Sequence, residues 1–243
     1  MFDSIKNKFQ FKFKNRNAAA NILAAALTDT ISKEELNKNA ITVLGIPRGG
    51  VILADLVATK LRASNFDIVI PRKLRIPFNE ETAFGAIMGD GTVYIDERIV
   101  KDLDISEEYI EKEKNFQLQE IERRSILYGK MKSQSPEPEH KTSSMRTTTI
   151  ILVDDGAASG ATVIAAARSV RKVLNPNKLI IALPVAPRET INKLLKKEVD
   201  QVEVVTTPSS LFFNSVGQYY QNFEPVSDEK VIEILKNRHK GIT

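Results

Sequence analysis

Short runs of apolar, often β-branched residues recur along the chain and are separated by longer segments with helical spacing of apolar residues. The runs are ITVLGI at 41–46, DIVIP at 67–71, TTTIILV at 147–153, LIIALP at 179–184 and VEVVT at 202–206. Their apolar residues follow one another without regular polar alternation. This pattern is typical of strands that are buried on both faces of a sheet.

The segments between these runs predict helices. They are the alanine-rich residues 17–30 and the ranges 50–63, 161–174 and 188–198. Because strands that alternate with helices are joined by right-handed crossovers, the order predicts an α/β fold with a doubly wound parallel sheet.

The middle of the chain departs from this alternation. Residues 72–82 are polar and contain a proline, and we interpret them as a mobile loop. Residues 83–96 predict a β-hairpin around Gly89-Asp90-Gly91, and residues 105–128 predict a charged helix. We therefore expect residues 83–130 to form a hairpin-and-helix insertion in the α/β fold.

The remaining segments complete a single domain that we expect to extend over residues 1–243. Residues 1–16 form an N-terminal arm, and residues 131–147 are rich in serine, proline and lysine and are interpreted as a linker. Residues 207–243 are expected to form a C-terminal cap, or hood. No internal repeat is visible in the sequence.

Composition excludes several kinds of chemistry. The chain has no cysteine, so disulfides, thiolate nucleophiles and sulfur-rich metal sites are excluded. His140 and His239 are the two histidines and lie far apart in the sequence, so we expect neither a histidine metal site nor a Ser-His-Asp relay. The sequence lacks a secretory signal and an apolar run of about 18 residues, so we expect a cytoplasmic protein without a membrane partner.

The net charge of the N-terminal residues 1–17 is +4, which equals the net charge of the whole chain. Residues 1–17 contain Lys6, Lys8, Lys12, Lys14 and Arg16 against Asp3, and Phe9, Phe11 and Phe13 alternate with polar residues. Such an arm binds nucleic acid or an anionic membrane surface, or it packs its phenylalanines into the core while its lysines stay solvated. We favour the packing interpretation and do not expect nucleic acid as a partner.

The turn within IILVDDGAASGAT at 150–162 has the residue types of a sugar-phosphate site. Small side chains allow backbone N–H groups to surround an oxyanion at a helix N-terminus, where Ser159 and Thr162 add hydroxyl donors. Asp154 and Asp155 suit paired sugar hydroxyls and can hold Mg²⁺ through water. The turn lacks the lysine and the spacing of a Walker A loop, and its acidic pair does not fit a dinucleotide fingerprint.

This segment resembles the signature that binds 5-phosphoribosyl-1-pyrophosphate (PRPP) in type I phosphoribosyltransferases. The motifs GIPRGG, PRKL, ERRSILYG and VGQYYQNF extend the resemblance to a largely unassigned branch of that family, over nearly the whole chain. The resemblance implies a Mg²⁺-dependent transferase of nucleotide metabolism that releases pyrophosphate from PRPP when a nitrogen nucleophile attacks. It also implies a homodimer.

The resemblance implies roles for individual residues. Asp154 and Asp155 would contact the ribose hydroxyls and a water-bound Mg²⁺, and the following loop would bind the 5-phosphate. The residues of that loop are Gly156, Ala157, Ala158, Ser159, Gly160, Ala161 and Thr162. The pyrophosphate would lie against Arg48 and Gly49, in a turn whose non-proline peptide is often cis in the family.

Arg72 and Lys73 follow the second predicted strand, and we expect them to reach the same pyrophosphate and to act in catalysis. They rank above Arg75, and the loop 72–82 that contains all three is a candidate lid.

The acceptor substrate is not defined by these motifs. Hypoxanthine-guanine members of the family have an aspartate where this chain has Ala158, which argues against a simple transfer of their substrate. Phe212, Phe213, Tyr219 and Tyr220 in the C-terminal cap either stack on a base or pack in the core. A non-catalytic PRPP or nucleotide sensor is the alternative function, and a hydrolase that uses water as acceptor is a more distant one.

Overall fold

The computed structural model describes residues 11–31, 41–129, 149–196 and 199–239. The predicted linker at 131–147 lies outside these ranges. Five parallel strands form the main sheet in the order β2-β1-β6-β7-β8. They are β1 (Ile41–Gly45), β2 (Asn65–Ile68), β6 (Thr149–Val153), β7 (Lys178–Val185) and β8 (Gln201–Thr206). The predicted parallel sheet is confirmed, with β2 beginning and ending earlier than its apolar run.

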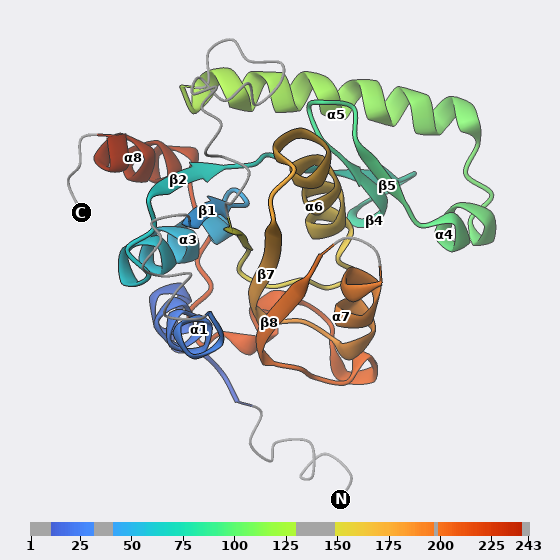
Figure 1. Ribbon diagram of the computed structural model, residues 1–243. Coiled ribbons are helices and arrows are strands. Elements are labelled where there is room, and N and C mark those ends of the chain that lie inside the picture. The colour runs from blue at the N-terminus through green and yellow to red at the C-terminus, as the bar shows by residue number, and fades with distance from the viewer. Residues whose placement is uncertain (1–10, 32–40, 130–148, 197–198, 240–243) are drawn as a thin grey trace, which may run out of the picture.

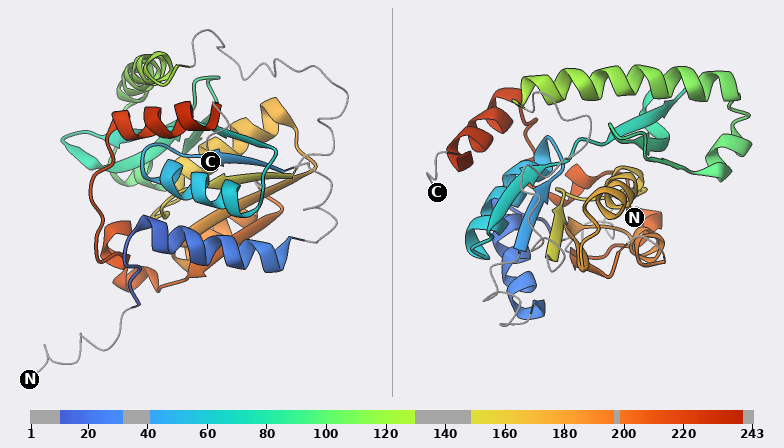
Figure 2. Two further views of the ribbon diagram at one scale, coloured as in Figure 1. Left: turned by 90° about the vertical axis from the view of Figure 1, so that its left-hand side faces the viewer. Right: turned by 45° about the horizontal axis from the view of Figure 1, so that its top comes forward.

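Helices cover both faces of this sheet (Figures 1 and 2). They are α1 (Arg16–Thr30), α3 (Gly49–Lys60), α6 (Ala161–Leu174) and α7 (Arg188–Leu195). Alternate residues of β6 enter different cores: Ile151 packs with the residues of α1 and α3, whereas Leu152 packs with those of α6 and α7. Burial on both faces is the reason why the strands are apolar throughout. The fold is therefore doubly wound, as predicted.

The strand order reverses direction between β1 and β6. The chain passes from β1 to β2 on one side, whereas β6, on the other side of β1, is followed by β7 and β8. In open α/β sheets, ligands bind at the carboxyl ends of the strands where this reversal occurs. The turns that follow β1 and β6 are therefore the expected place for a site.

The insertion builds a second, antiparallel sheet of three strands, β3 (Arg72–Ile76), β4 (Asn79–Ile87) and β5 (Val93–Ile95). The predicted hairpin corresponds to β4 and β5. The interpretation of 72–82 as a loop was wrong, because β3 and the start of β4 occupy this range and Leu74 is fully buried in a third core. Leu74 lies between the charged residues Lys73 and Arg75, so the sequence pattern did not indicate a strand here.

Two helices follow the small sheet. They are α4 (Glu97–Asp102) and α5 (Glu107–Leu127). Ser106 caps α5 by accepting a hydrogen bond from the N–H of Tyr109. Figure 2 shows α5 lying across the small sheet, and Ile121 on its inner face is buried with the third core. The charged helix predicted over 105–128 is confirmed, but α4 was not predicted.

The beginning of the described chain pairs with residues 219–221 beside the main sheet. The N–H of Phe13 donates to the carbonyl of Tyr219, and the N–H of Gln221 donates to the carbonyl of Phe13, both at 2.8 Å. Phe13 is 1% exposed and Phe11 is 52% exposed. Of the phenylalanines in the predicted arm, Phe13 follows the packing interpretation, Phe11 does not, and Phe9 lies outside the described residues.

The C-terminal segment contains two short 3-10 helices, η2 (Ser210–Phe212) and η3 (Val216–Tyr219), and the helix α8 (Asp228–His239). Within the described ranges, every helix is too short or too polar to cross a bilayer.

Candidate functional site

The turn after β1 and the turn after β6 lie against one another at the reversal of strand order. A Cβ placed on Gly49 would lie 1.8 Å from Oδ2 of Asp155, and one placed on Gly50 would lie 2.8 Å from the Cα of Asp154. Since real Cβ atoms do not approach other heavy atoms so closely, both positions require glycine. The structure thus brings the PRGG turn and the two acidic residues into direct contact.

The loop after Asp155 is held in shape by glycines and by bonds to its neighbours. Gly156 has φ +151° and Gly160 has φ +80°, both of which favour glycine. The N–H of Ala157 donates to the carbonyl of Val185 at 3.0 Å, and the hydroxyl of Thr190 donates to the carbonyl of Ala158. Ala158 and Ser159 are exposed at the start of α6, where a helix N-terminus attracts an anion.

The Asp154 carboxyl group lies at the end of the buried strand β6. Its Oδ1 accepts a hydrogen bond from the N–H of Asp155 at 2.8 Å. Burial raises the pKa of Asp154 well above its usual range, and the charge of Asp155 raises it further, while the charges of Lys73 and Arg16 oppose the rise. A buried carboxyl group of this kind favours a ligand that brings a cation or hydroxyl donors.

Asp155 has a partner that the sequence analysis missed. Nε of Arg16 lies 2.9 Å from Oδ2 of Asp155, and both side chains are largely buried, at 11% and 16% exposed. Burial raises the pKa of Asp155, and the positive charge of Arg16 works against this rise. Arg16 and Asp155 are 139 positions apart. The sequence carries no local signal for such a pair.

Arg16 also connects Asp155 to the C-terminal segment. Its Nη1 donates to the carbonyl of Glu224 at 2.7 Å, and its guanidinium lies 3.8 Å from the ring centroid of Phe223. The Tyr220 hydroxyl donates to the carbonyl of Asp155 at 2.6 Å. The beginning of α1 and residues 220–224 therefore form one wall beside the acidic pair.

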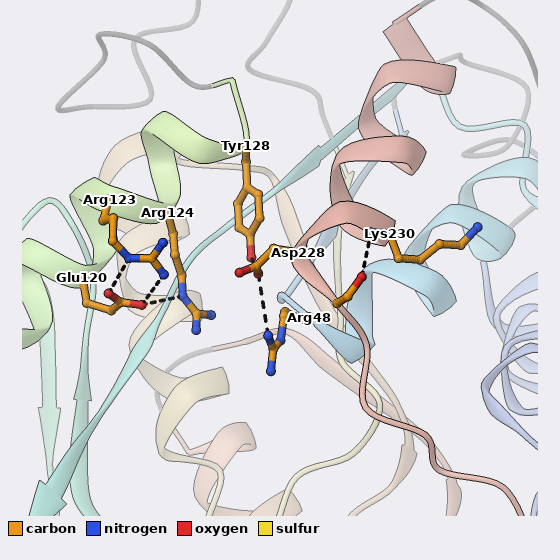
Figure 3. A network of polar contacts seen from close by, with 8 residues as sticks. Arg48, Glu120, Arg123, Arg124, Tyr128, Asp228 and Lys230 are labelled. Atoms are coloured by element: carbon orange, nitrogen blue, oxygen red, sulfur yellow. Dashed lines mark hydrogen bonds and ion pairs between the residues drawn. The ribbon is translucent and has the colours of Figure 1, made fainter.

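Arg48 stands at the start of α3. The peptide bond between Pro47 and Arg48 is cis, as the family resemblance implied. Nη1 of Arg48 lies 3.9 Å from Oδ1 of Asp228, which also accepts a hydrogen bond of 2.5 Å from the Tyr128 hydroxyl (Figure 3). The side chain remains 41% exposed, so most of its donors stay accessible.

The basic residues of β3 are divided between two environments. Nε of Arg72 donates to Oε1 of Gln117 on α5 at 2.9 Å, which turns Arg72 toward that helix. Lys73 is exposed, and its charge acts on Asp154. The backbone N–H of Arg75 donates to Glu113 of α5. Of the three, Lys73 is the residue that the structure places near the acidic pair.

The four aromatic residues proposed for the acceptor are not equivalent. Tyr219 and Tyr220 are 1% and 4% exposed. Phe213 stacks on Tyr219 with 5.3 Å between ring centroids, and Phe13 packs on Tyr220. This burial matches the core-packing interpretation for both tyrosines, whereas Phe212 is 71% exposed.

A cavity of about 360 Å³ opens on another side of Arg16. Its walls include Asn15 and Asn17 at the start of α1, Ile52 of α3, and Ser227 and Lys230 at the start of α8. Arg16 forms part of this wall and also contacts Asp155, so it is the residue that the cavity and the surroundings of the acidic pair share.

The described residues contain no group of three or more histidine, cysteine, aspartate or glutamate side chains that would enclose a metal ion. Asp154 and Asp155 fit a different mode of binding, in which a hydrated Mg²⁺ arrives with a phosphate ligand and the carboxylates contact its water.

Comparison with protein families places this arrangement in context. The family described as "Phosphoribosyl transferase domain" matches residues 89–221, which include the acidic pair and the loop that follows it.

Sequence relatives cover almost the whole chain. It is 33% identical over 228 residues to Mycobacterium tuberculosis proteins named "Putative phosphoribosyl transferase Rv0571c" and "Putative phosphoribosyl transferase MT0597", from strains H37Rv and CDC 1551. The matched region covers 94% of this chain but 47% of each relative. The chain therefore spans about half the length of the curated relatives that it matches.

A solved structure resembles most of the chain. It is the crystal structure of the protein TT1426 from Thermus thermophilus, with a TM-score of 0.66 and 31% sequence identity. The match covers 93% of this chain and 98% of that one.

Proposed function

The chain belongs to the phosphoribosyl transferase domain family, and from this premise we propose that it transfers the 5-phosphoribosyl group of PRPP to a nitrogen nucleophile. The observation that carries the proposal is the contact between the PRGG turn and the two aspartates at the reversal of strand order. In this reaction the C1–O bond to pyrophosphate breaks and a C1–N bond forms. The electron pair leaves with the pyrophosphate oxygen, and the nucleophile loses a proton.

The 5-phosphate would bind at the N-terminus of α6, in the loop from Gly156 to Thr162. There the helix dipole, the exposed turn at Ala158 and the Ser159 hydroxyl favour an anion over a neutral group. Asp154 and Asp155 would then face the ribose 2- and 3-hydroxyls, for which ionised carboxylates are strong acceptors. Oδ2 of Asp155 already accepts a hydrogen bond from Arg16, and Oδ1 of Asp154 already accepts one from the N–H of Asp155.

The pyrophosphate would lie toward the turn after β1 and the small sheet. Arg48 and Lys73 carry accessible positive charge there, and Gly49 allows the Asp155 carboxylate to lie against the turn. Mg²⁺ bound with the substrate would neutralise part of the leaving group's charge. The protein's own contribution is to hold the sugar, to present cations to the leaving group and to limit access of water.

The decisive experiment measures pyrophosphate release from PRPP and Mg²⁺ in the presence of a panel of nucleobases and small amides. We expect release that depends on one class of nitrogen acceptor. Release with no acceptor would indicate a hydrolase instead. A folded protein that binds PRPP but releases no pyrophosphate with any acceptor would contradict the transferase proposal.

The sensor alternative requires a binding test without turnover, and the structure changes its design. Deleting residues 1–16 would remove Phe13 and Arg16, which contact Tyr219 and Asp155. Deleting residues 1–10 removes Lys6, Lys8 and Phe9 and keeps those contacts. Salt-sensitive nucleic-acid binding that disappears in the shorter deletion, together with PRPP binding without turnover, would favour the sensor.

A further inference from the structure

Thr190 lies in the first turn of α7 and is buried, at 4% exposed. A threonine hydroxyl in a helix commonly donates to a carbonyl three or four positions earlier in the same helix. The hydroxyl of Thr190 donates instead to the carbonyl of Ala158, 32 positions away, in the loop from Gly156 to Thr162. Thr190 therefore connects α7 to the loop that follows the acidic pair.

This hydrogen bond fixes the direction of one peptide unit in the loop. The peptide between Ala158 and Ser159 is trans, so its C=O and N–H groups point in opposite directions. Because the carbonyl of Ala158 points toward the buried hydroxyl of Thr190, the N–H of Ser159 points away from α7. Ala158 and Ser159 are exposed, so this N–H is directed toward the open side of the loop. A backbone donor there attracts an anion, whereas an outward carbonyl would repel one.

The methyl group of Thr190 contacts the loop at a second point. A Cβ placed on Gly160 would lie 2.8 Å from Cγ2 of Thr190, so the methyl group packs closely against that glycine. Gly160 has φ +80° and directly precedes α6. The hydroxyl and the methyl group of one side chain thus hold the residues on both sides of Ser159.

Helix α7 is held in place by contacts with other elements. Leu194 is fully buried in the core that α7 shares with α6. Glu189 accepts a hydrogen bond from the hydroxyl of Ser210 in the C-terminal segment, and Nζ of Lys193 lies 3.3 Å from Oδ2 of Asp96. These contacts make α7 a fixed support from which a side chain can act on the loop.

We infer that Thr190 is a positioning residue for the phosphate-binding loop. Its hydroxyl holds the peptide between Ala158 and Ser159 with the N–H toward the 5-phosphate, and its methyl group holds Gly160. The inference rests on the proposed function and extends it to α7, outside the segment 154–162 that carries the recognisable motif. Thr190 acts through the loop and makes no contact with the ligand itself.

Conservative changes separate the hydroxyl from the methyl group. Thr190→Val has the size of threonine but leaves the carbonyl of Ala158 without its donor, so the peptide is free to turn. Thr190→Ser keeps the hydroxyl and removes the methyl group. We expect Thr190→Val to weaken binding of ribose 5-phosphate and of Mg²⁺-PRPP by about fivefold, the order of one hydrogen bond. Thr190→Ser should change either affinity by less than about twofold. Titration calorimetry measures the affinities, and thermal melts monitor folding.

Inorganic pyrophosphate with Mg²⁺ distinguishes positioning of the loop from general damage to the site. Its proposed place is beside the turn after β1, so we expect Thr190→Val to bind it with the affinity of wild type. An equal loss of affinity for pyrophosphate and for ribose 5-phosphate would contradict the inference. Ser210→Ala is the control variant, because it removes a hydroxyl that contacts the residue next to Thr190 on α7. It should leave all three affinities within about twofold of wild type.

The outcomes also separate this inference from the proposed function. If Thr190→Val and Thr190→Ser bind ribose 5-phosphate equally well, Thr190 does not position the loop, while the proposed function stands. If wild type binds ribose 5-phosphate in a hydroxyl-dependent way but does not bind PRPP, the loop is a phosphate site positioned by Thr190 and the proposed function fails. If wild type binds neither ligand, both are wrong. Should Thr190→Val not fold, Thr190→Ala takes its place, since it differs from Thr190→Ser by the hydroxyl alone.

Discussion

The large parallel sheet and the small antiparallel sheet contribute to the candidate site in different ways. The large sheet supplies two turns whose residues are consecutive in sequence, Pro47 to Gly50 and Asp154 to Thr162. The small sheet presents single side chains of β3: Lys73 acts on Asp154 through its charge, whereas the orientation of Arg72 depends on Gln117 of α5, 45 positions away. Turns after parallel strands are local structures, whereas side-chain partners across elements depend on the whole fold.

This difference shows which functional residues cannot be recognised from the sequence alone. The acidic pair and the small-residue loop are recognisable because one contiguous segment must satisfy the backbone geometry of the turn. Arg16 acts through partners on other elements, and in the sequence it is an ordinary member of a basic arm. Experiments that disturb each kind of contact separately will test whether the distinction has consequences for stability and binding.

Removing Arg16 should have the largest effect. Arg16→Ala leaves the carboxylate of Asp155 without its cation, in a position where both side chains are mostly buried. We expect the free energy of unfolding to fall by about 3 kcal/mol, the usual order for breaking a buried ion pair. Chemical denaturation measures the change, and Lys12→Ala, an exposed change in the same arm, is the control.

The pairing itself is tested by a double-mutant cycle. Combining Arg16→Ala with Asp155→Asn should be much less destabilising than the sum of the single changes, because the variant no longer contains an unpaired charge. Additive effects would show that Arg16 stabilises the wall through Phe223 and Glu224 alone.

Adding a methyl group at Gly49 should have the next largest effect. A methyl group there would collide with the Asp155 carboxylate and with Nε of Arg16, so Gly49→Ala must displace these side chains. We expect a loss of about 2 kcal/mol in stability, as for other overpacked positions, and a loss of PRPP binding. The matched change in the turn between β4 and β5, Gly89→Ala, meets Ile121 at 3.2 Å and should be tolerated. Wild-type PRPP affinity in Gly49→Ala would contradict the close contact of the turns.

Much of the fold follows from the sequence, because the buried strands carry continuous apolar runs that report their environment directly. The small sheet was only partly predicted. Alternation of Arg72, Lys73 and Arg75 with a single buried Leu74 resembles a solvated loop, and only packing against Phe84 and Ile87 makes it a strand. The strand β3 therefore needed tertiary information that no local pattern contains.

The residues of the candidate site also fall into two groups, those predicted from local sequence and those whose role needed the structure. Asp154, Asp155 and the PRGG turn were identified from local residues and a family resemblance, and the structure places them in contact. Tyr219 and Tyr220 had two interpretations, stacking and packing, because an aromatic residue has the same sequence signal in either role. Their burial against Phe213 and Phe13 became visible only when distant segments were brought together.

Neutralising the acidic pair should weaken binding of Mg²⁺-PRPP, in addition to the stability that is lost when Arg16 loses its carboxylate partner. Replacing Asp154 and Asp155 by asparagine keeps their size but removes the charges that would attract Mg²⁺ and strengthen bonds to the ribose hydroxyls. We expect the affinity for Mg²⁺-PRPP to fall at least about tenfold, which corresponds to about 1.4 kcal/mol. Titration calorimetry measures this change. An unchanged affinity would remove the acidic pair from the site.

The smallest expected effect is the pH dependence of stability that the same pair produces. Burial raises the pKa of both carboxyl groups in the folded protein, so the folded state binds protons more tightly than the unfolded chain. Stability contributed by the protonated form is present at low pH and is lost as the pH rises from about 4 through the folded pKa values. Other groups, such as Glu120 with its pKa lowered to about 2, act in the opposite direction. The quantity to measure is therefore the difference in unfolding free energy between Asp154→Asn and wild type from pH 4 to pH 8. We expect this difference to move in favour of the variant as the pH rises, by less than about 1.4 kcal/mol per pH unit. A constant difference across this range would show that Asp154 has an ordinary pKa and is well solvated in the folded protein.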